Sequence, residues 1–424
     1  MLLMLSSEDG WALPSVETRR TRRPSQLADP IVQAILQRFG ASVTTLRCAH
    51  FRLDAAQDQV DAVFELENHG PSWTPPAEGR WVGREQATDV LTADARDRKT
   101  IMQWFDEGES WPALRAPWAR PGWHRRATIW AQAELARLGR HPSGTVTQVK
   151  HWSLSSILRF ETAGGQAWLK AVPSFFSDEG SLIQLLGQSL PENVPRVLSI
   201  APKERWLLMD TFPGEKLAVK ADVSQMAESL RLLATLQVAY ATRLDDLFAA
   251  GCPDCRLATL DGVLKALLAR SDVISSLNDD EVAGLTAFTA EVPDRCEALI
   301  DCGVPETLVH GDFHGANVAV SDDSLVLYDW PDGCVAHPFF DLATFMGPGL
   351  APRTKGKLIE AYLGVWSTHF PTAKLEAALR LAEPLFCLHH AISHQRIIDG
   401  IEPGERWEFS GSVQLWLRRL LAAA

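Results

Sequence analysis

Three polar side chains suited to metal binding and proton transfer lie close together in the C-terminal half of the sequence. Asp312 precedes Asn317 by five positions, and Asp329 ends a short apolar run further on. Two carboxylates and an amide oxygen suit a hard cation such as Mg²⁺, and one carboxylate can instead face a substrate hydroxyl. The residue types therefore predict a site that combines a divalent cation with a proton-accepting group.

A predicted hairpin explains how these side chains can converge. Two apolar runs flank the polar tetrapeptide 321–324, a pattern typical of two strands joined by a tight turn. If Val320 pairs with Leu325, Asn317 lies opposite Tyr328 and beside the carboxylate that follows it. Both polar side chains then lie at the open end of one hairpin, and the loop before it is short enough to hold the other carboxylate nearby.

This arrangement resembles the catalytic core of the aminoglycoside phosphotransferase and choline kinase group, distant relatives of the protein kinases. The group shares His-Gly-Asp, four residues, Asn, and then a strand ending in Asp before an aromatic residue. The matching residues here are His310-Gly311-Asp312, Asn317, Asp329-Trp330 and the later Asp341-Leu342-Ala343. One departure is Gly315, which stands where many relatives carry proline.

The resemblance implies a fold and a set of roles. The fold is α+β, a protein-kinase-like two-lobed phosphotransferase fold. Asp312 is expected to orient and deprotonate the acceptor hydroxyl, while Asn317 and Asp329 hold Mg²⁺ on the ATP phosphates. Without the resemblance, the same residues can be read as a solvated hairpin with incidental acids.

A lysine-bearing strand is predicted upstream, where the other half of a kinase site belongs. Residues 166–172 form an apolar run around Lys170, and a turn signal at 161–165 precedes them. The resemblance implies that Lys170 binds the ATP phosphates. Glu179 begins a segment that is apolar at helical spacing, so it lies near a helix start where it can pair with Lys170.

The sequence contains no glycine-rich phosphate loop. Residues 148–160 instead predict a strand pair whose turn carries serines. Ser153 and Ser155 can supply hydroxyl and backbone donors to the phosphates of ATP. The alternative, that the serines belong to a hairpin with a purely structural role, stays open.

An apolar strand beginning at Trp206 runs into a Pro-Gly turn and resembles the linker between the two kinase lobes. The resemblance implies that backbone groups from Asp210 to Phe212 hydrogen-bond the adenine edge. It also implies that the side chains of Met209 and Phe212 flank the adenine ring. An ordinary core strand followed by a turn is the alternative.

The acceptor is expected in a helical C-terminal region that the resemblance also indicates. Asp332 lies three residues past Asp329, and Glu383 and His389 lie on an apolar helical segment with further histidines at 390 and 394. Carboxylates suit hydroxyl or ammonium groups. We therefore expect the acceptor near Asp332, Glu383 and His389.

Composition limits the classes of partner and compartment. The net charge of −12 argues against a nucleic-acid partner, and no run approaches the roughly 18 apolar residues of a membrane span. Seven cysteines, an odd number, favour reduced thiols and a cytoplasmic location. The Cys-Pro-Asp-Cys segment at 252–255 has redox or zinc spacing but lacks a second pair.

The first part of the chain predicts a separate α+β domain, with helical spacing at 30–39 and strand-like runs at 42–53 and 61–66. Its order of elements resembles a Nudix domain. The helix that would bind metal reads Gln-Ala-Ile-Leu-Gln-Arg-Phe-Gly over 33–40 and has no carboxylate. Hydrolysis of a diphosphate is therefore not expected, and a spacer, regulatory or assembly role or an unrelated small domain are the alternatives.

Four segments result from these patterns. They are an accessory domain at 1–110, a Trp- and Pro-rich linker and helix at 111–144, a kinase-like N-lobe and hinge at 145–216, and a helical C-lobe at 217–424. Apolar periodicity at 226–236, 257–268 and 375–381 supports helices in the C-lobe.

The predicted function is ATP- and Mg²⁺-dependent O-phosphotransfer to a small hydroxyl-bearing molecule. Aminoglycosides, amino sugars, other sugars and amino alcohols all remain possible acceptors. The competing hypothesis is a catalytically silent nucleotide-binding protein with a regulatory or scaffold role.

Overall fold

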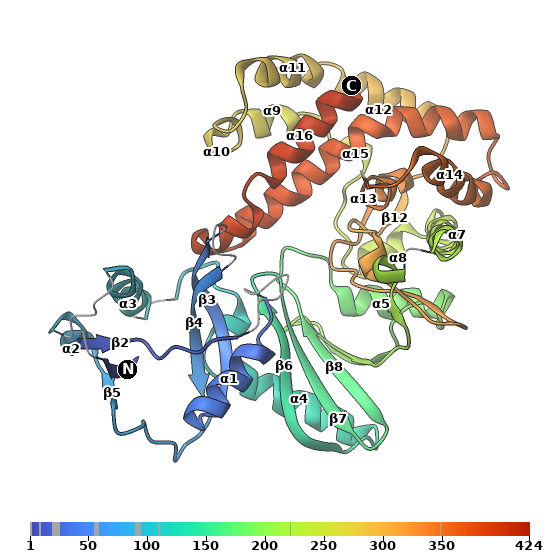
Figure 1. The fold of residues 1–424 in the computed structure, drawn as a ribbon. Helices are drawn as coiled ribbons and strands as arrows, with labels where there is room; N and C mark the ends of the chain where they lie inside the picture. Colours follow the sequence, from blue (N-terminus) through green and yellow to red (C-terminus); the bar gives the residue numbers. More distant parts are fainter. Residues whose placement is uncertain are drawn as a thin grey trace. The chain divides into compact units, whose positions relative to one another are not determined.

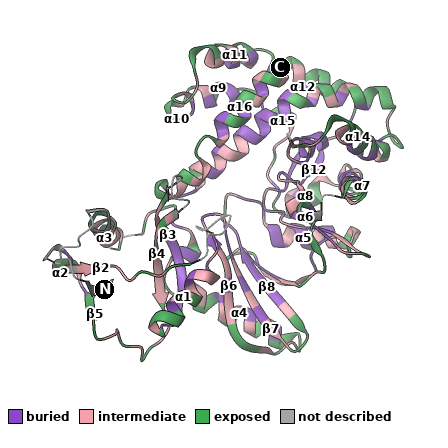
Figure 2. Cartoon of the chain, viewed as in Figure 1, coloured by how far each residue is buried: buried purple, intermediate pink, exposed green. Residues whose placement is uncertain are grey.

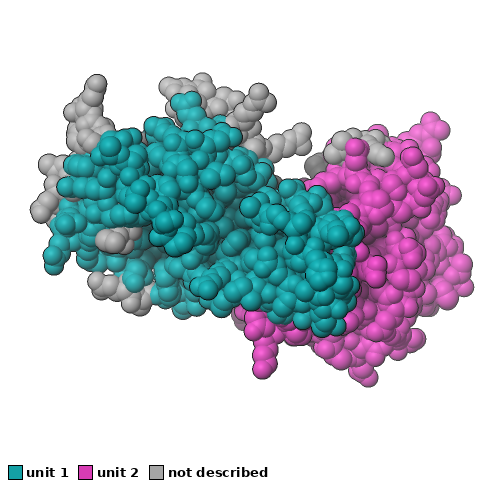
Figure 3. Space-filling view, turned by 90° about the horizontal axis from the view of Figure 1, so that it is seen from below, with its two compact units in different colours: residues 1–173, 401–406 teal, residues 174–400, 407–424 magenta. Residues whose placement is uncertain are grey.

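The computed structural model describes residues 2–7, 10–18, 26–54, 59–89, 95–108, 111–220, 222–347 and 349–424 (Figure 1). The chain forms two compact units, which Figure 3 colours separately. The first unit comprises Met1–Pro173 and Ile401–Arg406, and the second comprises Ser174–Gly400 and Trp407–Ala424. The division falls inside the range 145–216. Among the described ranges, no helix has the length and apolar character needed to cross a membrane.

The N-terminal part of the first unit is a mixture of short helices and antiparallel strands, as predicted. Its elements are β1 (Leu2–Ser7), β2 (Gly10–Ala12), α1 (Asp29–Phe39), β3 (Val43–Asp54), β4 (Gln59–Asn68), β5 (Gly79–Val82), α2 (Arg84–Asp89) and α3 (Ala95–Glu107). β1 pairs antiparallel with both β2 and β5. The expected helix at 30–39 and the two expected strands are confirmed as α1, β3 and β4.

Helix α1 packs against the long β3–β4 hairpin. A proline lies in its first turn, and the N–H of Gly40 closes its end on the Leu36 carbonyl. Ile31 and Ile35 are buried with Val43 of β3 in one apolar cluster. This cluster explains the helix, because the apolar residues recur on one of its faces.

The Trp- and Pro-rich linker forms no long helix, as its prolines predict. It contains the 3₁₀ turn η1 (Pro117–Ala119) and leads into α4 (Trp123–Arg137). Trp118 and Trp123 are each 2% exposed, and the Trp118 Nε1–H donates to the Trp152 carbonyl at 2.7 Å. The linker is therefore packed into the first unit.

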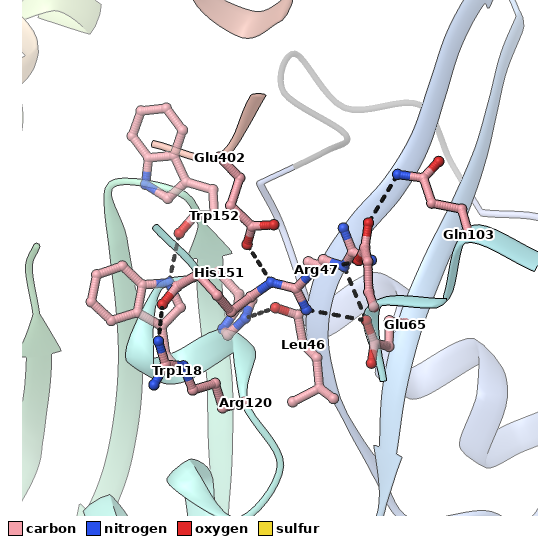
Figure 4. Close-up of polar contacts among 11 residues, drawn as sticks. Leu46, Arg47, Glu65, Gln103, Trp118, Arg120, His151, Trp152 and Glu402 are labelled. Carbon is pink, nitrogen blue, oxygen red and sulfur yellow. Dashed lines mark hydrogen bonds and ion pairs between the residues drawn. The ribbon is translucent and has the colours of Figure 1, made fainter. Parts of the chain in front are cut away.

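Five charged side chains form a largely buried cluster in the first unit (Figure 4). The side chain of Arg115 is fully buried, pairs with Glu402, and donates to Glu107 at 2.7 Å. Arg47 of β3 binds Glu65 of β4 at 3.0 Å and also pairs with Glu107. This cluster joins α3, the β3–β4 hairpin, the linker and the 401–406 segment.

Three antiparallel strands complete the first unit. They are β6 (Pro142–Trp152), β7 (Ser155–Thr162) and β8 (Gly165–Ala171). The predicted strand pair and the predicted lysine strand are confirmed, and Lys170 lies opposite Ile157 in the register. Figure 2 shows buried residues along β7 and β8.

The second unit is mainly helical, as predicted, with four short antiparallel strand pairings. Its elements are α5 (Glu179–Ser189), β9 (Val197–Ala201), β10 (Trp206–Asp210), β11 (Glu215–Lys216), α6 (Leu217–Lys220), α7 (Val223–Tyr240), α8 (Leu244–Ala249), η2 (Leu257–Thr259), α9 (Val263–Leu268), α10 (Ser271–Ile274), α11 (Asp279–Thr289), α12 (Val292–Asp301), β12 (Thr307–Val309), η3 (Gly315–Asn317), β13 (Val318–Val320), β14 (Leu325–Leu327), β15 (Cys334–Ala336), η4 (Pro338–Asp341), α13 (Leu342–Phe345), α14 (Pro352–Trp366), α15 (Thr372–Gly400), η5 (Pro403–Phe409) and α16 (Ser412–Ala423), where η5 extends across both units. β9 pairs with β10, β12 with β15, and β13 with both β11 and β14.

The structure differs from the prediction at residues 257–268, where the apolar periodicity suggested a helix. The apolar periodicity at 257–268 is divided between η2 and α9. Gly262 separates them with a left-handed φ of 71°, a conformation that glycine adopts without steric cost. The periodicity therefore marked buried positions correctly but not a continuous helix.

Replacing Arg115 by alanine is expected to destabilise the first unit by about 3–5 kcal/mol, because buried carboxylates lose their counter-charge. Urea unfolding followed by tryptophan fluorescence measures this change. Arg231→Ala is the control, since its pair with Glu228 is solvent-exposed and such pairs contribute at most about 1 kcal/mol. Equal losses in the two variants would contradict the role of burial.

Candidate active site

The loop that carries Asp312 follows a fully buried strand. β12 is buried at all three residues and pairs with β15, so the start of the loop is held firmly. Gly311 has a φ of 81°, and a Cβ atom there would lie 2.4 Å from the Asp332 carbonyl oxygen. Only glycine fits at this position. The close approach also places Asp332 against the loop.

A buried carboxylate, Asp341, clamps the backbone of this loop. Its oxygens accept hydrogen bonds from the N–H groups of His310 and Gly311, each at 2.9 Å. A third bond comes from the Gln237 amide at 2.9 Å. Burial raises the pKa of Asp341 to about 7, and the three N–H donors oppose that rise. Asp341 thereby determines the direction in which Asp312, the residue after Gly311, projects.

His310 is buried and neutral, and its hydrogen bonds define one tautomer. Burial lowers its pKa to about 4. Nε2 lies 3.2 Å from the Tyr328 carbonyl, which can only accept, so Nε2 carries the proton. Nδ1 then accepts from the Asp312 N–H at 3.4 Å. The ring also lies 4.4 Å from that of Trp330, so this histidine connects the loop to the end of the hairpin.

The Asp312 carboxylate itself is about half exposed, with 47% of its side chain accessible. Its Oδ2 accepts from the Asn317 Nδ2 and lies near His314 Nε2, each at 3.3 Å. Burial opposes protonation of His314, but the hydrogen bond to Asp312 and the charges of Asp312 and Asp329 raise its pKa above the ordinary value. An oriented carboxylate facing solvent is a suitable proton acceptor.

His314 was not among the sequence-predicted site residues. Its sequence signal is its position in the loop between Asp312 and Asn317, where it is the only other ionisable residue. Asp341 is similar, because the family resemblance marked its motif but gave it no role.

The predicted hairpin is confirmed in its register. Val320 lies opposite Leu325 in the β13–β14 pair, and the Tyr328 N–H donates to the Asn317 carbonyl at 3.1 Å. Asn317 is thus opposite Tyr328, as the pairing requires. Asp329 follows with a left-handed φ of 69°, an uncommon backbone conformation that aspartate tolerates better than most residues. Such conformations cluster at functional sites.

Asn317 and Asp329 carry the kind of oxygen ligands that a hard cation shared with a nucleotide would require. The Asn317 Nδ2 donates to the Asp312 carbonyl at 3.0 Å, which leaves Oδ1 as the free amide atom. Across the described ranges, no group of three His, Cys, Asp or Glu side chains is arranged to hold a metal alone. Mg²⁺ commonly takes one or two protein ligands together with phosphates and water, so two ligands suffice.

Glu179 is the first residue of α5 and is 3% exposed. Its Oε1 accepts the Trp330 N–H at 3.0 Å, which ties α5 to the residue after Asp329. The sequence predicted the helix start but not this contact, because the two residues are 151 positions apart. Glu179 belongs to the second unit, whereas its predicted partner Lys170 belongs to the first.

Lys170 and the serine-bearing turn lie in the first unit. Lys170 is 6% exposed on β8, and Ser153 and Ser155 are each 5% exposed. The Ser155 hydroxyl accepts from the Trp152 Nε1–H at 2.8 Å and so has a structural bond. The Ser153 hydroxyl has no hydrogen-bond partner among the described residues.

The strand predicted to begin at Trp206 is confirmed as β10, and residues 211–214 after it form no helix or strand. β10 has a register shift between Leu208 and Met209. The Asp210 side chain accepts from the Thr211 N–H at 3.0 Å, and the Phe212 ring lies 5.1 Å from that of Tyr328. β11, which follows residues 211–214, pairs with β13 of the hairpin. The segment from β10 to β11 therefore leads directly to the strand that follows Asn317.

The predicted acceptor residues lie in different surroundings. His389 is buried against Phe340, and burial lowers its pKa to about 4. His394 is partly buried and lies near enough to Asp312 for that charge to oppose the lowering of its pKa by burial. Glu383 is exposed on α15, about 16 Å along the helix from His394 at ~1.5 Å per residue. Of these helical residues, His394 is the one placed near Asp312.

Comparison with known proteins identifies the family of this chain. The model of the phosphotransferase enzyme family matches residues 145–375, more than half of the chain. The chain therefore belongs to the phosphotransferase enzyme family. No curated protein matches the sequence, and the family match gives no support to the Nudix resemblance of the accessory domain.

Several solved structures are similar to this chain over about two thirds of its length or more. The choline kinase LicA from Streptococcus pneumoniae is 13% identical, with a TM-score of 0.50 over 71% of this chain and 100% of that one. A choline/ethanolamine kinase family protein from Mesorhizobium loti is 14% identical, with a TM-score of 0.49 over 70% and 98%. The macrolide 2'-phosphotransferase MphH from Brachybacterium faecium is 19% identical, with a TM-score of 0.46 over 66% and 97%. The fold is protein-kinase-like and α+β, and the protein is a small-molecule kinase.

Replacing Asp341 by asparagine is expected to lower kcat on the order of 10²-fold, the scale for a misplaced catalytic group. Asparagine has one acceptor oxygen, and its amide would face an N–H donor of the loop. The KM for ATP should change little. Asp246→Asn is the matched control, because its carboxylate is exposed and bonds to Arg243. A kcat equal to that of the control would contradict the clamp.

Proposed function

We propose that the protein transfers the γ-phosphoryl group of ATP to a hydroxyl of a small acceptor, with Asp312 as the proton acceptor. The observation that carries this proposal is the state of Asp312. Its carboxylate is half exposed and oriented by Asn317 and His314, while the backbone of the two residues before it is held by the clamp of Asp341. A group that must meet a substrate hydroxyl has to be both accessible and fixed.

The chemistry asks mainly for position and charge. As the acceptor oxygen bonds to the γ-phosphorus, the bond from that phosphorus to the β–γ bridging oxygen breaks and ADP leaves. Asp312 accepts the hydroxyl proton. The His314 imidazole, 3.3 Å from Asp312 Oδ2, keeps this carboxylate from turning away from the acceptor. Phosphoryl transfer has a loose transition state, so the protein contributes mostly orientation.

Asn317 and Asp329 are the proposed Mg²⁺ ligands. When bound, the cation supplies charge neutralisation at the β- and γ-phosphates. Asn317 offers Oδ1, because its nitrogen is engaged by the Asp312 carbonyl. Asp329 is held by its neighbours, since the Tyr328 carbonyl and Trp330 N–H bond to His310 and Glu179.

Seven further residues are proposed for the nucleotide. Lys170 would bind the phosphates, with Glu179 as its charge partner, and the β6–β7 turn would contribute Ser153 and Ser155. The segment at the end of β10 would bind adenine through backbone groups at 210–212. The members of this set are Lys170, Glu179, Ser153, Ser155, Met209, Asp210 and Phe212. The aromatic contact of Phe212 with Tyr328 supports a flat apolar surface beside the linker.

The proposed acceptor is a small hydroxyl-bearing molecule, and Asp332 is its nearest proposed carboxylate. Asp332 packs on Gly311, directly beside the residue that would accept the proton. Glu383 and His389 remain proposed acceptor residues, and the charge of Asp312 also acts on the pKa of His394 on the same helix. Relatives of similar fold include proteins named as choline kinase and macrolide 2'-phosphotransferase. An aminoglycoside, amino sugar, sugar or amino alcohol fits this range.

A panel of such acceptors, with ADP release as the readout, tests the proposal. Asp312→Asn should keep Mg·ATP binding but lose turnover by about 10²-fold or more, because an amide cannot accept the proton. The competing hypothesis of a silent nucleotide-binding protein predicts ATP binding with no ADP release for any acceptor. Turnover of a verified acceptor by Asp312→Asn at the wild-type rate would remove Asp312 from its role.

Loss of either proposed metal ligand should weaken ATP binding, but to different extents. Asp329→Ala is expected to weaken ATP binding in the presence of Mg²⁺ about tenfold or more, the scale of losing one charged ligand. Asn317→Ala should weaken it less, because an amide oxygen carries no charge. Calorimetric titration with ATP, with and without Mg²⁺, measures both. Unchanged affinity in both variants would show that the cation binds elsewhere.

A further inference from the structure

The β6–β7 hairpin is bonded to the accessory region, defined here as the described residues before 111. Gln148 of β6 is 4% exposed, and its side-chain amide bonds twice to the backbone of Thr45 on β3. Its Oε1 accepts the Thr45 N–H and its Nε2 donates to the Thr45 carbonyl, each at 2.8 Å. The side chain thus takes the place of a peptide group from a neighbouring strand.

His151, three residues later, extends this contact to β7. Its Nε2 lies 2.6 Å from the Leu46 carbonyl (Figure 4). Because a carbonyl only accepts, Nε2 carries the proton and Nδ1 is the acceptor. Nδ1 lies 2.8 Å from the Gln148 Nε2 and 3.1 Å from the Ser156 hydroxyl, both of which can donate to it. A continuous set of buried hydrogen bonds therefore runs from β3 to Ser156.

The turn between β6 and β7 is also held by a hydrogen bond from the Trp- and Pro-rich linker at 111–144. The Trp118 Nε1–H donates to the carbonyl of Trp152, the last residue of β6 (Figure 4). The Trp152 Nε1–H in turn donates to the Ser155 hydroxyl at 2.8 Å. Trp152, before the turn, is therefore held by Trp118, which lies outside the β6–β8 sheet. Ser155, after the turn, is held by Trp152.

Ser153 is the residue of this turn that has unused hydrogen-bonding capacity. It is 5% exposed, and its hydroxyl has no hydrogen-bond partner within the described residues. A buried hydroxyl without a partner is costly and calls for an explanation. A phosphate oxygen of a nucleotide would supply the partner, since it is a strong acceptor.

We propose that Gln148 and His151 are positioning residues for nucleotide binding, through which the accessory region holds Ser153 in place to bind a phosphate. This inference rests on the proposed function. This chain has no glycine-rich loop whose flexible backbone could adapt to the phosphates. The turn between β6 and β7 therefore has to hold its binding conformation before the nucleotide arrives. Preorganisation of this kind raises affinity by removing the cost of ordering the site. The accessory region is then part of the nucleotide site.

A purely structural role makes different predictions. If the Gln148 network only stabilised the first unit, its loss would lower the free energy of unfolding and leave the affinity for ATP unchanged. The positioning role requires a change in the Kd and KM for ATP at a temperature where the variant is folded, with the KM of the acceptor unchanged.

The test uses the full chain, with calorimetric measurement of the Kd for Mg·ATP. Gln148→Leu removes both bonds to Thr45 and is expected to raise this Kd about tenfold, the scale of losing the order of one or two side chains. Gln166→Leu is the matched control, because Gln166 lies on the same sheet and bonds to Glu161 at 3.0 Å. Its affinity for ATP should equal that of the wild type.

A double-mutant cycle with Ser153→Ala identifies the route. If Gln148 acts through Ser153, the double variant should bind ATP no more weakly than Ser153→Ala alone, because the residue being positioned is already gone. Additive effects would overturn the route through Ser153. An unchanged Kd in folded Gln148→Leu would overturn the proposal itself.

Trp118→Phe serves if Gln148→Leu does not fold. It removes only the indole donor to Trp152 and keeps an aromatic ring, and a rise of a few-fold in the Kd for ATP is expected. A Kd equal to that of the wild type would then count against the proposal. A wild-type chain that binds no ATP would refute the proposed function instead, so the two failures are distinguishable.

Discussion

The carboxylate of Asp341 is the interaction on which the geometry of the site depends. It is fully buried, and its bonds go to two successive N–H groups of the loop and to an amide of α7. The loop residues at this point have no strand partner, so the carboxylate replaces the hydrogen bonds that regular structure would provide. Asp312 follows at once, and its direction is set by backbone that cannot move without leaving the buried Asp341 carboxylate short of hydrogen-bond donors.

Hydrogen bonds connect the hairpin end to this loop and to α5. His310 bonds to the Tyr328 carbonyl and Glu179 to the Trp330 N–H, so both peptide groups that flank Asp329 have partners. The left-handed backbone of Asp329 costs free energy, and these flanking bonds hold it. The proposed base and the proposed metal ligand therefore belong to one hydrogen-bonded assembly within the second unit.

The first unit uses buried polar groups in a comparable way. Arg115 pairs with Glu402, although the two are 287 positions apart, and Gln148 bonds to Thr45 at a separation of 103. Burying such groups is favourable only when every partner is present. The accessory region is consequently bonded to the β6–β8 sheet through buried side chains of β6.

The sequence by itself determined the local elements of this protein. Strand alternation and turn residues correctly predicted the pairing of Val320 with Leu325, the strand of Lys170 and the start of α5, because these depend on hydrogen bonds between near neighbours. The motif spacing also identified the family. Only the tertiary structure showed the contact of Glu179 with Trp330, the nearness of His394 to Asp312, and the cluster around Arg115. These contacts join segments far apart in the chain, and their partners depend on how whole elements pack, which no local periodicity encodes.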